Sequence, residues 1–136
     1  MRKELIAVAF VVAGVAGCSS PPTTPRAAAN LTIDGATHAT RPAKCSQLQG
    51  YRTIDIRDHD SQVEAVVLLS GPRTIPEWVK IHNVGGFTGS FWQGGVGDAR
   101  VDVNNDAYTI TGSAYGISST NPNRVITTDF KLTAEC

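Results

Sequence analysis

The sequence predicts an all-β domain over residues 31–136, in the form of a small antiparallel sandwich or a partly open barrel. Apolar and polar side chains alternate at period two in several segments, as in half-buried antiparallel strands. Turn residues such as Gly-Gly and Asn-Asn-Asp separate these segments, and no stretch of the domain holds an apolar 3.6-residue period through a full helix. About a hundred residues suffice for one compact domain, and short, closely spaced strands are typical of both architectures.

The alternation is clearest in three segments. Ile54 and Ile56 point to one face of a predicted strand, and Val101 and Val103 do the same in another. The third segment is the C-terminal one, whose inward-facing residues are expected to be Ile126, Phe130, Leu132, Ala134 and Cys136. This pattern places the last cysteine beside the core.

The middle of the domain is more densely apolar. Residues 63–69 end in four consecutive apolar positions, which predicts a central strand covered on both faces. Two further strands are predicted at 78–84 and 87–92. The Gly85-Gly86 pair between them suits a two-residue hairpin turn, in which positive φ angles are required.

Residues 1–17 have the pattern of a lipoprotein signal peptide. Arg2 and Lys3 precede an apolar run that is shorter than the about 20 residues of a membrane span. The run ends in Val-Ala-Gly before Cys18, a lipobox in which small residues fit the peptidase and the thiol accepts a diacylglyceryl group. We expect cleavage before Cys18, acylation by chains such as palmitate, and anchoring at the outer face of the cell membrane. An ordinary signal peptide that borders a cysteine is the alternative.

Residues 18–30 are expected to form the lipidated N-terminus and an extended tether. Ser, Pro, Thr and Ala dominate this segment, and Arg26 is its only charge, so the segment cannot bury a core. Thr23 and Thr24 are candidate sites for O-linked sugar, because an extended segment rich in Ser, Thr and Pro is accessible to transferases.

Three cysteines are an odd number for a secreted protein. The lipid would occupy Cys18, which leaves Cys45 and Cys136 as a pair. Disulfides form and persist beyond the membrane, so a disulfide between these two residues is expected. Neither cysteine has a neighbour in sequence that would activate a catalytic thiolate.

Charge and motifs argue against several classes of function. Twelve basic residues balance twelve acidic ones, so the chain has no net positive charge that would attract nucleic acid. The Asp58-His59-Asp60 cluster is interpreted as a polar turn between strands rather than a metal site, since established ligand spacings are missing. Residues 102–106 resemble the opening of a calcium loop, but Ala107 replaces the required glycine, so a hairpin turn is predicted. With no Gly-x-Ser-x-Gly motif either, we expect no cofactor and no catalytic residues.

The aromatic residues leave two alternatives open. Trp78 is opposite in parity to its apolar strand neighbours, and Trp92 is opposite in parity to Phe87 and Phe91. Either all of these rings fill a core, or Trp78, Trp92 and Tyr115 belong to an exposed face that holds a lipid, a glycan or a partner protein.

Several motifs are shared with a known family. The segments 31–35 (LTIDG), 108–116 (YTITGSAYG) and 130–136 (FKLTAEC), with the lipobox and Cys45, resemble the mycobacterial 19 kDa lipoprotein antigen (LpqH-like) family. The chain departs from that family's pattern in the aromatic residues of its middle part and in a shorter, less threonine-rich tether. The resemblance implies an envelope-anchored surface antigen without enzymatic activity, whose acylated N-terminus is recognised by host Toll-like receptor 2.

Two functions therefore remain as hypotheses. The first is a surface interaction protein that acts through its lipid and through an exposed face of the β-domain. The second is a small carrier or sensor of an apolar ligand, such as a lipid or glycolipid, held between its sheets.

Overall fold

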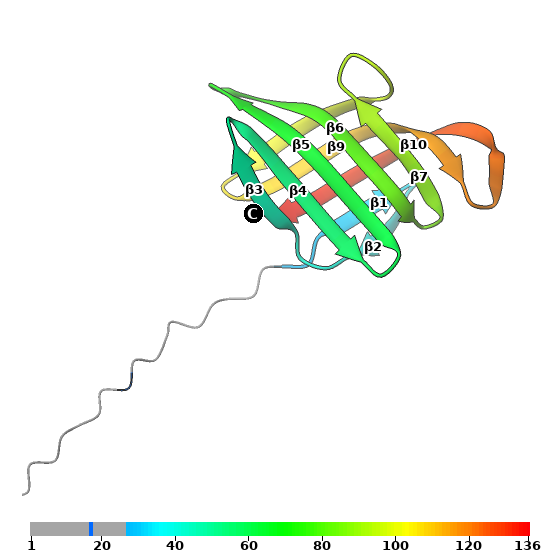
Figure 1. Ribbon diagram of the computed structural model, residues 1–136, viewed down its shortest axis with the longest axis horizontal. Helices are drawn as coiled ribbons and strands as arrows, with labels where there is room; N and C mark the ends of the chain where they lie inside the picture. The colour runs from blue at the N-terminus through cyan, green and yellow to red at the C-terminus, as the bar shows by residue number, and fades with distance from the viewer. Residues whose placement is uncertain (1–16, 18–26) are drawn as a thin grey trace, which may run out of the picture.

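The computed structural model describes residue 17 and residues 27–136. All regular elements in this part of the chain are β-strands (Figure 1). Over the same residues, no helix is long and apolar enough to cross a membrane. The strands are β1 (Asn30–Ile33), β2 (Ala36–Ala39), β3 (Lys44–Leu48), β4 (Tyr51–Asp58), β5 (Ser61–Ser70), β6 (Arg73–Val84), β7 (Phe87–Trp92), β8 (Asp98–Asn104), β9 (Ala107–Ser118) and β10 (Asn121–Glu135).

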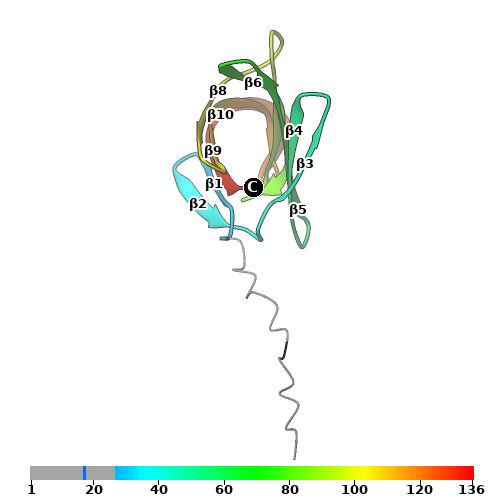
Figure 2. The ribbon, with the colours of Figure 1, turned by 90° about the vertical axis from the view of Figure 1, so that its left-hand side faces the viewer.

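The ten strands form one antiparallel sheet in the order β2-β1-β10-β9-β7-β6-β5-β4-β3. Strand β8 lies off this path and pairs with β9, beside the part of β9 that β7 does not reach. The sheet curls around a single core, but its two edges, β2 and β3, do not pair with each other (Figure 2). This confirms an all-β antiparallel domain, and the single open sheet corresponds to the partly open barrel rather than to two stacked sheets.

The concave face of the sheet carries the core. Ile54 and Ile56 on β4 are buried, as the alternation predicts. On β10, Phe130, Leu132 and Ala134 are also buried. Ile126 and Cys136 are half-buried and pack against the same cluster, which confirms the predicted inward face of the last segment.

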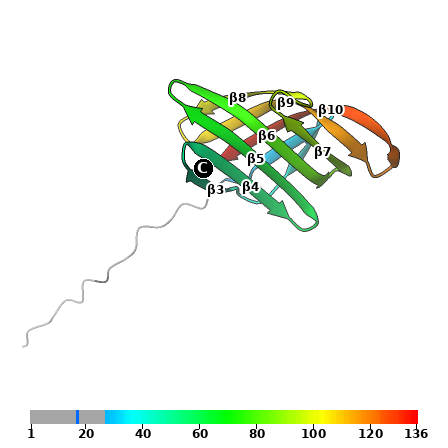
Figure 3. The same ribbon diagram turned by 45° about the horizontal axis from the view of Figure 1, so that its top comes forward.

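Two details of the predicted burial are wrong. On β5, residues at every second position are buried, but Val66 and Leu68 are only half-buried. A single curled sheet has no second layer outside it, so the central strand β5 (Figure 3) is covered fully on one face only. On β8, Val101 is half-buried and Val103 is 41% exposed, because β8 pairs with β9 alone among the described strands, which leaves its other edge unpaired.

The predicted turns are confirmed. Gly85 and Gly86 join β6 to β7 with φ angles of 57° and 79°, the positive values that a two-residue hairpin turn requires. Asn105, with a φ of 55°, turns the chain between β8 and β9. The segment that resembled a calcium loop is therefore a hairpin.

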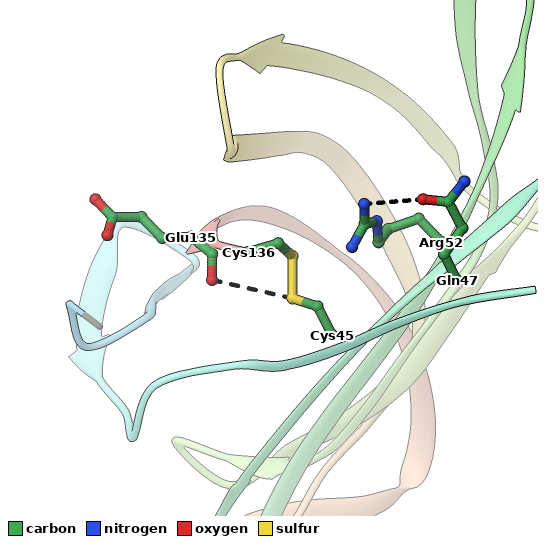
Figure 4. The surroundings of a disulfide bond; sticks show 5 residues. All are labelled: Cys45, Gln47, Arg52, Glu135 and Cys136. Carbon is green, nitrogen blue, oxygen red and sulfur yellow. Dashed lines mark hydrogen bonds between the residues drawn. A yellow bond between two sulfur atoms is a disulfide. The ribbon is translucent and has the colours of Figure 1, made fainter. Parts of the chain in front are cut away.

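A disulfide joins Cys45 to Cys136, as predicted (Figure 4). Cys45 lies on the edge strand β3, and Cys136 directly follows β10, so the bond links the two sides of the open sheet. The Sγ atom of Cys45 lies 3.9 Å from the carbonyl oxygen of Glu135, a contact only, since an oxidised sulfur has no proton to donate. Nearby, Arg52 donates a hydrogen bond of 3.0 Å to Gln47 Oε1.

Candidate functional site

Trp78 and Trp92 form a stacked pair on the convex face of the sheet. Trp78 lies on β6 opposite Trp92, the last residue of β7. Their ring centroids are 5.9 Å apart, and the ring planes differ by 28°. Such offset stacking between cross-strand neighbours contributes stability beyond the area that it buries.

Strand alternation explains why these rings face outward. Val79 and Phe91, the adjacent residues on the same two strands, are paired with each other and fully packed in the core. Side chains of successive residues point to opposite faces, so the two tryptophans must lie on the convex face. Trp92 is accordingly 43% exposed.

Lys80 places a positive charge over this pair. Its Nζ atom lies 4.7 Å from the ring centroid of Trp78 and 5.3 Å from that of Trp92, within the range of cation–π contact. Sequence reasoning did not single out Lys80. The available signal is its position two residues after Trp78, which puts both side chains on the same face of β6.

Tyr115 lies on the same face, in the neighbouring row of paired residues. Ser90 on β7 pairs with Lys80 on one side and with Tyr115 on β9 on the other. Cross-strand partners share a face, so Tyr115 is diagonal to Trp92, and its side chain is 50% exposed. We call the cluster of Trp78, Lys80, Trp92 and Tyr115 the aromatic face.

The remaining aromatic candidates are in the core. Phe87 and Phe91 are both at least 97% buried, and Tyr108 is buried as well. The rings therefore divide between the two alternatives that the sequence left open: the phenylalanines fill the core, whereas the tryptophans and Tyr115 are on the outside.

Asp58-His59-Asp60 forms the turn between β4 and β5, as predicted, with His59 at a φ of 50°. Asp58 lies 3.7 Å from Arg41 and 3.6 Å from the exposed imidazole of His59. Within residues 27–136, no three His, Cys, Asp or Glu side chains come together to hold a metal ion. Cys18, Thr23 and Thr24, the predicted lipidation and glycosylation sites, lie outside the described residues.

The protein is an open, curled β-sheet whose two sides are joined by one disulfide, and a lipobox precedes it in the sequence. This is the pattern of a small bacterial lipoprotein. A family model described as Mycobacterium 19 kDa lipoprotein antigen matches residues 22–136. The chain belongs to this family. As a member of a lipoprotein family, the protein is membrane-anchored in the cell envelope.

Relatives from three mycobacteria match along nearly the whole chain. A protein of Mycobacterium tuberculosis named "Probable lipoprotein LppE" is 65% identical over 130 residues, which cover 95% of this chain and 93% of the relative. A "Putative lipoprotein" of Mycobacterium avium subsp. hominissuis is 33% identical, with 97% of this chain and 92% of the relative covered. A third, of Mycobacterium indicus pranii, is 32% identical and is covered in full.

Proposed function

We propose that this protein is a non-enzymatic surface lipoprotein, which displays its β-domain at the outer face of the cell membrane on a lipid attached to Cys18. The observation that carries the proposal is membership of a lipoprotein antigen family in a chain whose own sequence has a lipobox before Cys18. In this proposal residues 1–17 are removed, and the predicted tether of residues 18–30 links the domain to the membrane and carries sugar on Thr23 and Thr24. Its last two residues already belong to the domain, because Ala29 is buried in the core and Asn30 begins β1.

The acylated N-terminus is the part that host Toll-like receptor 2 recognises in this proposal. Each buried methylene contributes about 0.8 kcal/mol, so one acyl chain anchors weakly, whereas two or more anchor firmly. The same chains offer a large apolar group to a lipid-binding receptor. In this proposal, receptor activation therefore depends on the lipid.

The aromatic face is the interaction surface of the domain in this proposal. Its support is geometric: two stacked tryptophans, a lysine over both rings and an exposed tyrosine lie on neighbouring rungs of the sheet. Exposed tryptophan and tyrosine rings are among the residue types that contribute most to the binding energy of protein interfaces.

The carrier alternative has less support. The interior of the curled sheet is occupied by a continuous cluster of buried side chains, including Leu31, Ile81 and Ile110. Protein interiors are packed about as densely as organic crystals, so a ligand at the centre would have to displace this core.

The experiment that tests the proposal uses Cys18→Ser, expressed in a mycobacterial host. Without the thiol the protein cannot be acylated, so we expect it to leave the membrane fraction and to lose Toll-like receptor 2 signalling in a reporter cell line. Its thermal midpoint should equal that of the parent domain, because Cys18 precedes the first strand, β1, by twelve residues in the sequence.

Cys45→Ser is the matched control, since it removes a different cysteine. This variant lacks the disulfide and should melt earlier, yet its lipidated N-terminus should signal nearly as well as the parent. If the Cys18→Ser protein signals at the parent's potency, the lipid is only a tether and the proposal is wrong.

A further inference from the structure

A pocket lies at the end of the curled sheet that is opposite the disulfide. It has a volume of about 310 Å³ and is lined mainly by Ile33, Asp34, His38, Phe87, Ile126 and Thr128. These residues come from β1, the hairpin to β2, β7 and the first half of β10 (Figure 1). At about 3.3 Å per residue of strand, Thr128 is about 26 Å from Cys136, so the pocket is separate from the disulfide.

The inner wall of the pocket is apolar. Ile33 and Phe87 are 6% and 3% exposed, and Ile126 packs against the same core. These side chains point to the concave face of the sheet, where the core stops short of the strand ends. The pocket is therefore an extension of the core that no side chain fills.

Thr128 is the polar residue of this wall. It is only 8% exposed, and no other side chain among residues 27–136 hydrogen bonds to its hydroxyl. This hydroxyl is not among the fully buried polar atoms that lack a partner, so it remains free to hydrogen bond to a molecule that enters the pocket.

Two further polar residues border the pocket. The imidazole of His38 is packed so closely against the β6–β7 turn that a Cβ atom on Gly85 would lie 2.8 Å from Nε2. Asp34, at the exposed β1–β2 turn, contributes a carboxylate at the rim. A carboxylate accepts hydrogen bonds from hydroxyl groups and repels anions.

We propose that this pocket binds a neutral amphiphile with one short hydrocarbon chain and a hydroxyl-bearing head, of the monoacylglycerol class. The chain lies against Ile33, Phe87 and Ile126, the ester oxygen accepts a hydrogen bond from Thr128, and a head-group hydroxyl donates to Asp34. The volume is about twice that of an engineered cavity of roughly 150 Å³ that holds benzene, so on the order of a dozen non-hydrogen atoms fit. This inference does not depend on the aromatic face or on receptor recognition.

The test uses the mature chain, residues 18–136, with Cys18→Ser, so that neither acyl chains nor detergent compete for the pocket. The probe is 1-octanoyl glycerol below its micellar concentration, titrated in two-dimensional amide NMR. We expect saturable shifts at Ile33, Phe87 and Thr128, with no change in tryptophan fluorescence, because both tryptophans lie on the opposite face of the sheet.

Two probes with the same chain test the head group. Octanoate should bind at least tenfold more weakly than 1-octanoyl glycerol, because Asp34 repels a carboxylate. Equal or tighter binding of octanoate or of octylamine overturns the assignment of a neutral head, and the absence of saturable shifts with any of the three probes overturns the site itself.

Two variants locate the binding. Ile126→Trp should fill the pocket and abolish binding, whereas Val125→Trp, on the adjacent residue that is 51% exposed, should bind as the parent does. Thr128→Val keeps the shape of the side chain and should weaken binding about fivefold, the loss expected for one neutral hydrogen bond. Parent-like affinity in both Ile126→Trp and Thr128→Val contradicts the proposal even if one of them is less stable.

Discussion

Gly85 shows how a single residue serves both the backbone and the pocket. Its φ of 57° is in the left-handed region, which L side chains rarely adopt. A Cβ atom there would also meet the imidazole of His38. Gly35, at the β1–β2 turn, has a φ of 80° and open space around it. A side chain at either glycine would strain the backbone, but only one at Gly85 would also meet His38. Comparing substitutions at the two positions therefore separates the effect of backbone strain from that of steric contact.

We predict that Gly85→Ala lowers the free energy of unfolding more than Gly35→Ala does. Both variants should lose about 1–2 kcal/mol to the left-handed backbone, and Gly85→Ala about 1 kcal/mol more to the contact with His38. Chemical denaturation of the two variants measures the difference. In a His38→Ala background the extra loss should vanish, and an unchanged loss there would show that the imidazole is not the obstacle.

At the scale of strands, β6 and β7 each have one face in the core and one in solvent. The paired residues Val79 and Phe91 are buried on the inner face, while Trp78 and Trp92 stack on the outer face. The outer pair is thus held by a hairpin whose inner face is fixed by core packing. Since these are the only tryptophans of the chain, intrinsic fluorescence reports on this face alone.

We predict that Trp78 and Trp92 are energetically coupled. In a cycle of Trp78→Ala, Trp92→Ala and the double variant, the coupling should be about 0.5–1.5 kcal/mol, the range of stacked aromatic pairs. Denaturant unfolding measures it, and the exciton signal of the stacked indoles in circular dichroism should be lost in either single variant. Strictly additive losses would show that the rings do not interact in solution.

At the scale of the whole molecule, the open sheet is joined across its gap by the disulfide. The disulfide ties β3 to the end of β10 over a sequence separation of 91 residues. At the same end, the amide of Ala29 donates to the carbonyl of Arg41, and that of Cys136 donates to the carbonyl of Asp106, which extends the pairing of β1 with β2 and of β10 with β9. The edges β2 and β3 do not pair, so the disulfide is the covalent link that holds the two sides of the sheet together at this end.

We predict that the double variant Cys45→Ala/Cys136→Ala is less stable by about 2–4 kcal/mol. The chain-entropy estimate for so long a loop is about 4.6 kcal/mol, and measured losses are commonly smaller. The thermal midpoint should fall by at least about 10 °C, as scanning calorimetry can measure. Changing both cysteines avoids a free thiol, so a midpoint within about 2 °C of the parent would mean that the disulfide is dispensable.

Much of this architecture could be predicted from the sequence. Alternation at period two depends on the geometry of the strand alone, so it identified the inward residues of β4 and β10. It also showed that Trp78 and Trp92 are opposite in parity to their apolar neighbours, but not which set faces outward. The Gly85-Gly86 turn was predictable because the positive φ angles that it requires depend on these two residues alone. The Cys45–Cys136 bond followed from cysteine count once the lipobox accounted for Cys18.

The sequence by itself thus determined which side chains share a strand face, and the tertiary structure decided which faces are covered and what lies beside them. Strand pairing joins residues far apart in the chain, so no local pattern could show that one sheet curls around the core, leaving Val66 half-buried and Val103 exposed. For the same reason, only the fold brings Lys80 and Tyr115 to one face, and only the fold leaves a pocket between Ile33, Phe87 and Thr128. Local geometry fixes the orientation of a side chain, whereas its neighbours depend on non-local packing.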